Sequence, residues 1–147
     1  MLTVKRCQYM ANVFDQMNDA VTSTVELHNV LFKTEWIKHP DLLNTTYLPY
    51  NGLHNHLLCD GVIAHVHSSK IEVEWEEYAL GCRTDSGSYY LSFEELCEDT
   101  REAAIRERVD AQVEQLIEQA KKRKAILEDA KVAEYKRLKR EIGIDED

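Results

Sequence analysis

The chain has 147 residues, of which 44% are hydrophobic and 31% charged, and its formal net charge is −9. This length suits one ordinary domain, and no apolar run approaches the roughly 20 residues that a membrane span needs. The first residues form no continuous apolar stretch with a cleavage site, which argues against a secretory signal. The cysteines are scattered without a CxxC pair, so we expect reduced thiols in a cytoplasmic protein: Cys7, Cys59, Cys82 and Cys97.

The acidic charge is concentrated in the middle of the chain. Residues 60–102 carry three Lys or Arg against eleven Asp or Glu, a net charge of −8, whereas residues 1–59 carry −1 and residues 103–147 are neutral. A surface of this sign argues against contact with a nucleic-acid backbone, which Lys and Arg residues bind. It fits a basic protein partner or a solvated surface.

The N-terminal segment predicts a long amphipathic helix over residues 3–37. Apolar or small residues recur there with a 3-4-3-4 spacing, and the residue before Pro40 is disfavoured in a helix. The β-branched residues at 21–25 leave a helix followed by a strand as an alternative. Residues 40–52 contain both prolines and are expected to form a connecting loop.

Residues 53–98 predict a small antiparallel β unit. Asp60-Gly61, between two apolar runs, is a strong signal for a two-residue hairpin turn, and Ser68-Ser69 is expected to form the next turn. In this register four histidines share one sheet face with Glu72 and Glu74: His54, His56, His65 and His67. The Gly/Ser-rich residues 80–88 are expected to form a turn between later strands.

The histidine face has two interpretations. Opposed imidazoles could converge on zinc, with His54, His56, His65 and His67 as ligands and Glu72 as a fourth ligand or orienting base. Such a protein would bind a transition metal and could be a metal-dependent hydrolase. Alternatively, this is the solvated face of a half-buried sheet, and no cofactor is bound. No other catalytic motif stands out, which favours a binding protein over an enzyme and gives no catalytic residues.

The acidic residues of the β unit are the candidate partner-binding surface. They are accompanied by two aromatic residues, and the set is Glu72, Glu74, Glu76, Glu77, Trp75 and Tyr78. Glu77 follows Glu76 directly, so it is expected on the other side of the strand or at a bulge.

Residues 99–147 predict a long charged helix. Asp99 as N-cap with Glu102 three residues later is typical of a capping box, and Gly143 is expected to end the helix. A helix of some 40 residues cannot bury its apolar stripe on so small a sheet, so it needs the N-terminal helix or a second subunit. We therefore expect a helix bundle or coiled-coil contact and a homo-oligomer. The basic residues 121–124 are flanked by acids, which argues against nucleic-acid binding.

The stretch GVIAHVHSSKIEVEWEEY, followed by SYYLSFEEL, resembles the strand pattern of small SH3-like barrels. With the long helix after it, the region of residues 60–142 is similar to small proteins of tailed bacteriophages. The resemblance implies a binding module, and a phage origin implies a protein that engages a host or defence protein. The sequence therefore predicts an α+β protein with segments 1–52, 53–98 and 99–147, whose SH3-like sheet is a complete or incomplete barrel. The expected function is inhibition of a host or defence protein through an acidic surface.

Overall fold

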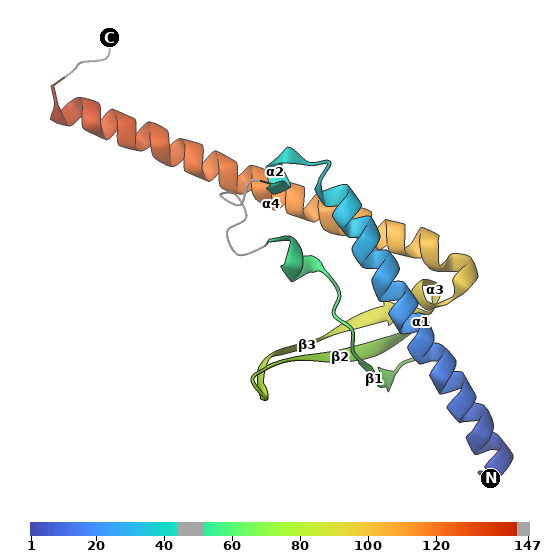
Figure 1. The fold of residues 1–147 in the computed structure, drawn as a ribbon. Coiled ribbons are helices and arrows are strands. Elements are labelled where there is room, and N and C mark those ends of the chain that lie inside the picture. The colour runs from blue at the N-terminus through green and yellow to red at the C-terminus, as the bar shows by residue number, and fades with distance from the viewer. Residues whose placement is uncertain (44–51, 144–147) are drawn as a thin grey trace.

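The computed structural model describes residues 1–43 and 52–143. Two long helices cross each other, and a three-stranded antiparallel sheet lies beside the first of them (Figure 1). The elements in chain order are α1 Val4–Trp36, α2 Pro40–Leu43, the 3-10 helix η1 Leu53–His56, β1 Val62–Val66, β2 Lys70–Ala79, β3 Cys82–Ser92, α3 Phe93–Leu96 and α4 Glu98–Glu141. The predicted α+β class is confirmed. Most of the predicted loop of residues 40–52 lies outside the described residues.

Helix α1 is one continuous helix of 33 residues, so the alternative of a helix followed by a strand is wrong. Its β-branched residues Val21, Thr24 and Val25 are buried, with the valines packed against the sheet and α3. Burial in this way outweighs the small deficit in helix propensity. The first turns of α1 project beyond the sheet, and the side chains of Met10 and Phe14 are 50% and 46% exposed there (Figure 1).

The sheet has the strand order β1-β2-β3. His65 pairs with Glu72, and the backbone N–H of His67 donates to the Lys70 carbonyl at 2.8 Å, so the predicted turn at residues 68–69 is confirmed. A bulge between Ile63 and His65 shifts the pairing by one residue, so Ile63 faces Val73 instead of Glu74. The described residues form three strands in an open sheet, and the SH3-like barrel is not confirmed.

The predicted hairpin turn at Asp60-Gly61 is wrong, because residues 53–59 form no strand. Gly61 is required for a different reason. A Cβ atom on Gly61 would lie 2.2 Å from the carbonyl oxygen of Glu74, so only glycine lets the chain approach β2 this closely where it enters β1.

Helix α4 has 44 residues, which corresponds to about 66 Å at 1.5 Å per residue. It begins at Glu98, so the predicted N-cap Asp99 is wrong. The capping box instead belongs to α3, where Ser92 and Glu95 bond to each other's backbone. Gly143, at φ 75°, follows the end of the helix as predicted.

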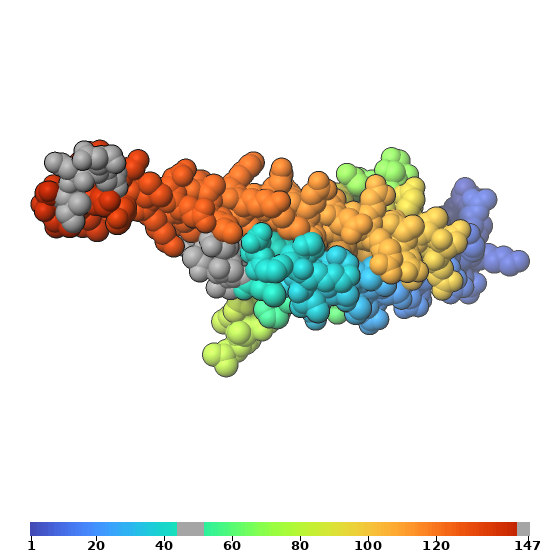
Figure 2. Space-filling model, turned by 90° about the horizontal axis from the view of Figure 1, so that it is seen from above, coloured from blue at the N-terminus to red at the C-terminus, as the bar shows by residue number. Residues whose placement is uncertain are grey.

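Two clusters of buried side chains hold the elements together. The first joins α1, α2 and α4 through Phe32, Trp36, Leu42, Ile105, Val109, Val113, Leu116 and Ala120. The second joins α1, the sheet and α3 through Val21, Val25, Ile71, Val73, Leu91 and Leu96. Helices α1 and α2 together therefore cover the apolar stripe of α4 as far as Ala120. Beyond it α4 continues past α1 and α2 (Figure 2). No helix in the described ranges is long and apolar enough to cross a membrane.

Candidate functional site

The candidate site is the face of the sheet turned away from α1, which we call the outer sheet face. Side chains alternate along a strand, and Ile71, Val73 and Leu91 are buried on the opposite face. The cross-strand pairs Glu72–Tyr90, Glu74–Ser88 and Glu76–Ser86 therefore lie on the outer face. This face comprises Val62, His65, His67, Lys70, Glu72, Glu74, Glu76, Tyr78, Arg83, Ser86, Ser88 and Tyr90.

Three glutamates form a row along β2 on this face. Glu72, Glu74 and Glu76 are two residues apart, so neighbouring carboxylates start about 6.5 Å from each other along the strand. Arg83 lies 3.7 Å from Glu76, but both side chains are about half exposed, so this ion pair stabilises the chain little. Ser86 and Ser88 stand beside the row and line a shallow cavity of about 320 Å³ together with Glu74, Glu76, Arg83, Trp75 and Gly87. The arrangement suits cationic side chains of a partner.

Aromatic and basic side chains lie at the end of this row that is nearest the helices. The ammonium group of Lys70 lies 4.3 Å from the centroid of the Tyr90 ring, and the His67 ring is 5.9 Å from it. At the other end, the hydroxyl of Tyr78 donates a hydrogen bond to Glu76. This bond and the negative charge of Glu76 raise the pKa of Tyr78.

The β2–β3 hairpin carries the row away from the body of the protein (Figures 1 and 2). Its turn is Leu80-Gly81, since Ala79 pairs directly with Cys82. Both turn residues have positive φ, 54° for Leu80 and 78° for Gly81, as a two-residue hairpin turn requires. Leucine is sterically disfavoured in this left-handed conformation, which lowers the stability of the fold. The Leu80 side chain is fully exposed at the tip of the hairpin.

Two of the predicted partner-binding residues lie on the other, inner face. Glu77 pairs with Asp85 and is followed by a bulge, as the sequence indicated. Trp75 is half-buried, and its ring lies over Gly87, where a Cβ atom would be 2.7 Å from the indole. Burial and the nearby carboxylates of Glu77, Asp85 and Asp60 raise the pKa of the Cys59 thiol. Because its ring lies over Gly87, Trp75 packs against the inner face of the hairpin and is not part of the outer sheet face.

The structure separates the four histidines that the sequence placed on one face. His54 and His56 lie in η1, and the His56 ring is 5.9 Å from the Phe32 ring and 6.1 Å from the Trp36 ring. His56 therefore packs against the helices, far from the arrangement that the predicted hairpin implied.

Only His65 and His67 reach the outer sheet face, with ring centroids 6.2 Å apart. His65 stands opposite Glu72. In residues 1–43 and 52–143, no group of three His, Cys, Asp or Glu side chains is placed to hold a metal ion. The zinc hypothesis stays a prediction, without the four-histidine face on which it depended.

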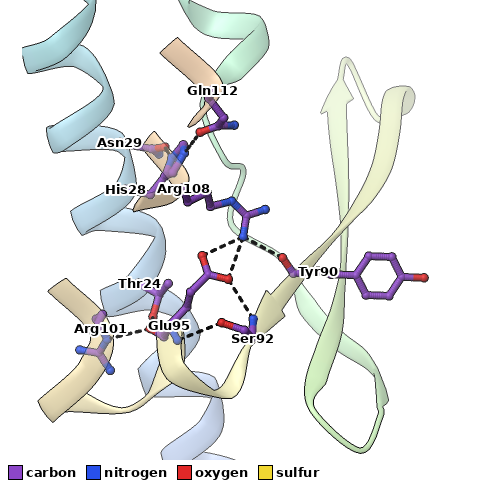
Figure 3. A network of polar contacts seen from close by, with 9 residues as sticks. All are labelled: Thr24, His28, Asn29, Tyr90, Ser92, Glu95, Arg101, Arg108 and Gln112. Atoms are coloured by element: carbon purple, nitrogen blue, oxygen red, sulfur yellow. Dashed lines mark hydrogen bonds and ion pairs between the residues drawn. The ribbon is translucent and has the colours of Figure 1, made fainter. Parts of the chain in front are cut away.

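A polar network fixes the sheet to the helices (Figure 3). The Glu95 carboxylate, which is 9% exposed, accepts hydrogen bonds from Arg108 of α4 at 2.9 and 3.1 Å and from the backbone N–H of Ser92 at 2.9 Å. The same Arg108 nitrogen donates to the carbonyl of Tyr90 at 2.9 Å. The Thr24 hydroxyl of α1 donates to the Glu95 carbonyl at 2.8 Å. The Tyr90 side chain points away from this network, toward the outer sheet face.

A second set of polar contacts places the segment before β1. Asn29 of α1 accepts from the backbone N–H of Leu58 and donates to its carbonyl, both at 2.9 Å. The buried His28 ring bridges Asn29 and Gln112 of α4, at 3.0 and 2.7 Å. These contacts hold the backbone of Leu58 against α1, so its N–H and C=O groups are not available to extend the sheet.

Sequence reasoning found the glutamate row but missed its neighbours on β3. Ser86 and Ser88 were assigned to a turn, because the segment is rich in Gly and Ser, whereas Tyr90 was expected to lie in a Tyr-rich strand. The alternation of residues 86, 88 and 90 on one side and 87, 89 and 91 on the other was the signal of a strand. No protein-family model, curated protein or solved structure matches this chain.

Proposed function

We propose that this chain is a non-enzymatic interaction module whose β2–β3 hairpin binds a basic surface of a partner protein. The observation that supports it is the row Glu72, Glu74 and Glu76 on an exposed hairpin that projects from the helical body. A row of carboxylates accelerates encounters with a cationic surface and gives specificity for it. The helices would supply the scaffold and any self-assembly.

The partner class follows from the resemblance of residues 60–142 to phage proteins. On that basis the partner would be a host or defence protein that the chain inhibits by occupying a basic surface. Surfaces of this kind in host proteins commonly bind nucleic acid through Lys and Arg. An acidic hairpin can compete for them without any catalytic step.

Reversing two charges should abolish partner binding. The double variant Glu74→Lys/Glu76→Lys should retain at least tenfold less partner than the native chain, because close charge pairs across an interface couple by roughly 1.5 kcal/mol or more. Both side chains are exposed, so the urea midpoint should stay unchanged. The measurement is quantitative mass spectrometry of proteins captured from a lysate of the natural host.

The control is Glu114→Lys/Glu128→Lys, which changes the net charge equally on exposed positions of α4. It should capture as much partner as the native chain. Capture by the hairpin variant at the native level would refute the proposed function.

Leu80 offers a test in which stability and binding move in opposite directions. Asparagine tolerates the left-handed conformation, so Leu80→Asn should raise the free energy of unfolding by about 0.5–1 kcal/mol. Leu80 is exposed at the hairpin tip, and burial of a leucine by a partner stabilises a complex by about 1.5–3 kcal/mol. We therefore expect at least tenfold weaker partner binding from this more stable variant. Unchanged binding would remove the tip from the interface.

A further inference from the structure

Part of strand β2 has a neighbour on one side only. Strand β1 pairs with β2 no further than Glu74, whereas β3 pairs with β2 along its whole length to Ala79. Within the described residues, the segment Trp75–Ala79 therefore forms an open sheet edge. Edges of this kind present unpaired backbone donors and acceptors to solvent.

The direction of the backbone groups at this edge follows from the register. The Lys70 carbonyl accepts from His67 on the β1 side of β2. In an antiparallel ladder alternate residues direct their N–H and C=O groups to the same side. Glu76 and Tyr78 therefore direct their backbone groups toward the open side.

The opposite edge of the sheet is covered near the helices. There the carbonyl of Tyr90 on β3 accepts a hydrogen bond from Arg108 of α4 at 2.9 Å. Nothing comparable is present at Glu76 or Tyr78 among the residues that the structure describes. The open edge of β2 belongs to the strand that carries the glutamate row, and this distinguishes it from the β3 edge.

Carboxylates flank the open edge on both faces of the hairpin. Glu74 and Glu76 lie on the outer face, and Glu77 and Asp85 lie on the inner face with Asp60 nearby. A second copy of this chain is a poor occupant, because pairing two such edges would bring these carboxylates together, and like charges on neighbouring strands are destabilising.

We propose that the open edge of β2 accepts an extended, lysine- or arginine-rich segment of the partner as an added strand. This inference rests on the proposed function and specifies how the partner is held. Main-chain hydrogen bonds to Glu76 and Tyr78 align the segment. Its alternate side chains then reach Glu74 and Glu76 on one face and Glu77 and Asp85 on the other.

The test uses the full native chain, and the probe is a capped seven-residue, lysine-rich peptide that carries lysines on both faces of its extended form. Binding is followed by fluorescence anisotropy, and backbone amide exchange is followed by NMR. We expect binding to slow exchange at the amides of Glu76 and Tyr78. A peptide of the same charge, N-methylated at the amides that would face β2, should bind at least tenfold more weakly. A peptide with glutamate in place of lysine should not bind.

Three results would overturn strand addition. They are equal affinity for the methylated and unmodified peptides, unchanged exchange at the two amides on binding, and amides that are already protected in a peptide-free dimer. The first two leave charge attraction and the proposed function intact. That function fails separately, if Glu74→Lys/Glu76→Lys captures the partner as the native chain does.

Discussion

Replacing Arg108 with alanine should lower the free energy of unfolding by about 2–4 kcal/mol. The Glu95 carboxylate is 9% exposed, and Arg108 is its cationic partner. Without the guanidinium, the Ser92 backbone N–H is the one donor that the described residues still offer to this buried carboxylate. Because the Arg108 side chain is itself 25% exposed, water replaces part of the lost interaction, which keeps the expected cost below that of a fully buried pair. Urea denaturation followed by circular dichroism measures the change.

The matched control for this prediction is Arg106→Ala. Arg106 pairs with Glu102 on the same helix at 3.0 Å, but the two side chains are 56% and 70% exposed. Loss of such a pair should cost less than about 0.5 kcal/mol. If the Arg108 and Arg106 variants were equally stable, the Glu95 network would not contribute to folding.

A second variant separates the charge from the rest of the side chain. Adding Glu95→Gln to Arg108→Ala removes the unpaired buried charge, so the double variant should recover part of the lost stability. The amide oxygen of glutamine can still accept from the Ser92 N–H. Recovery would show that Arg108→Ala lowers the free energy of unfolding because it leaves the Glu95 carboxylate without a cationic partner.

The helices could be predicted largely from the sequence, because their signals are periodic over many residues. The 3-4 spacing gave α1 its correct extent, although the cluster at residues 21–25 favoured a strand locally. Tertiary packing decides between helix and strand here, because Val21 and Val25 of the helix are buried against Ile71, Val73 and Leu91. The local sequence pattern does not predict this contact between distant segments.

The first hairpin was predicted wrongly, because a glycine in a tight turn and a glycine required for a close backbone approach cannot be told apart in a sequence. Asp60-Gly61 has the composition of a tight turn, but Gly61 is needed where the chain crosses close to Glu74. The leucines before it do not lie in a strand. Leu53 and Leu57 pack against the cluster of the two long helices, and Leu58 packs against the cluster below the sheet.

The second hairpin turn was predicted too broadly. Residues 80–88 were expected to form it, but the turn is Leu80-Gly81 alone and residues 82–88 belong to β3, because leucine at the first position gives no signal for positive φ. The glutamate row was nevertheless predicted correctly, since the alternation of residues 72, 74 and 76 does not depend on where the hairpin turns.

Replacing Phe32 with alanine should lower the free energy of unfolding by about 3–5 kcal/mol. Phe32 has no exposed surface and packs in the cluster that joins α1, α2 and α4. Its ring centroid lies 5.7 Å from that of His28, 5.8 Å from Trp36 and 5.9 Å from His56. A cavity at this point would remove contacts with three rings on two segments of the chain. Urea denaturation followed by tryptophan fluorescence measures the change, since Trp36 borders the cavity.

Val30→Ala is the control for Phe32→Ala, because Val30 lies on the same helix with 61% of its side chain exposed. Its effect should stay within about 0.5 kcal/mol.

Phe32→Leu keeps most of the buried volume and should cost about 1–1.5 kcal/mol. A native domain is commonly stable by only 5–15 kcal/mol, so Phe32→Ala could leave a large unfolded fraction at physiological temperature. A loss below about 1 kcal/mol would mean that the cluster joining α1, α2 and α4 contributes little to the stability of the fold.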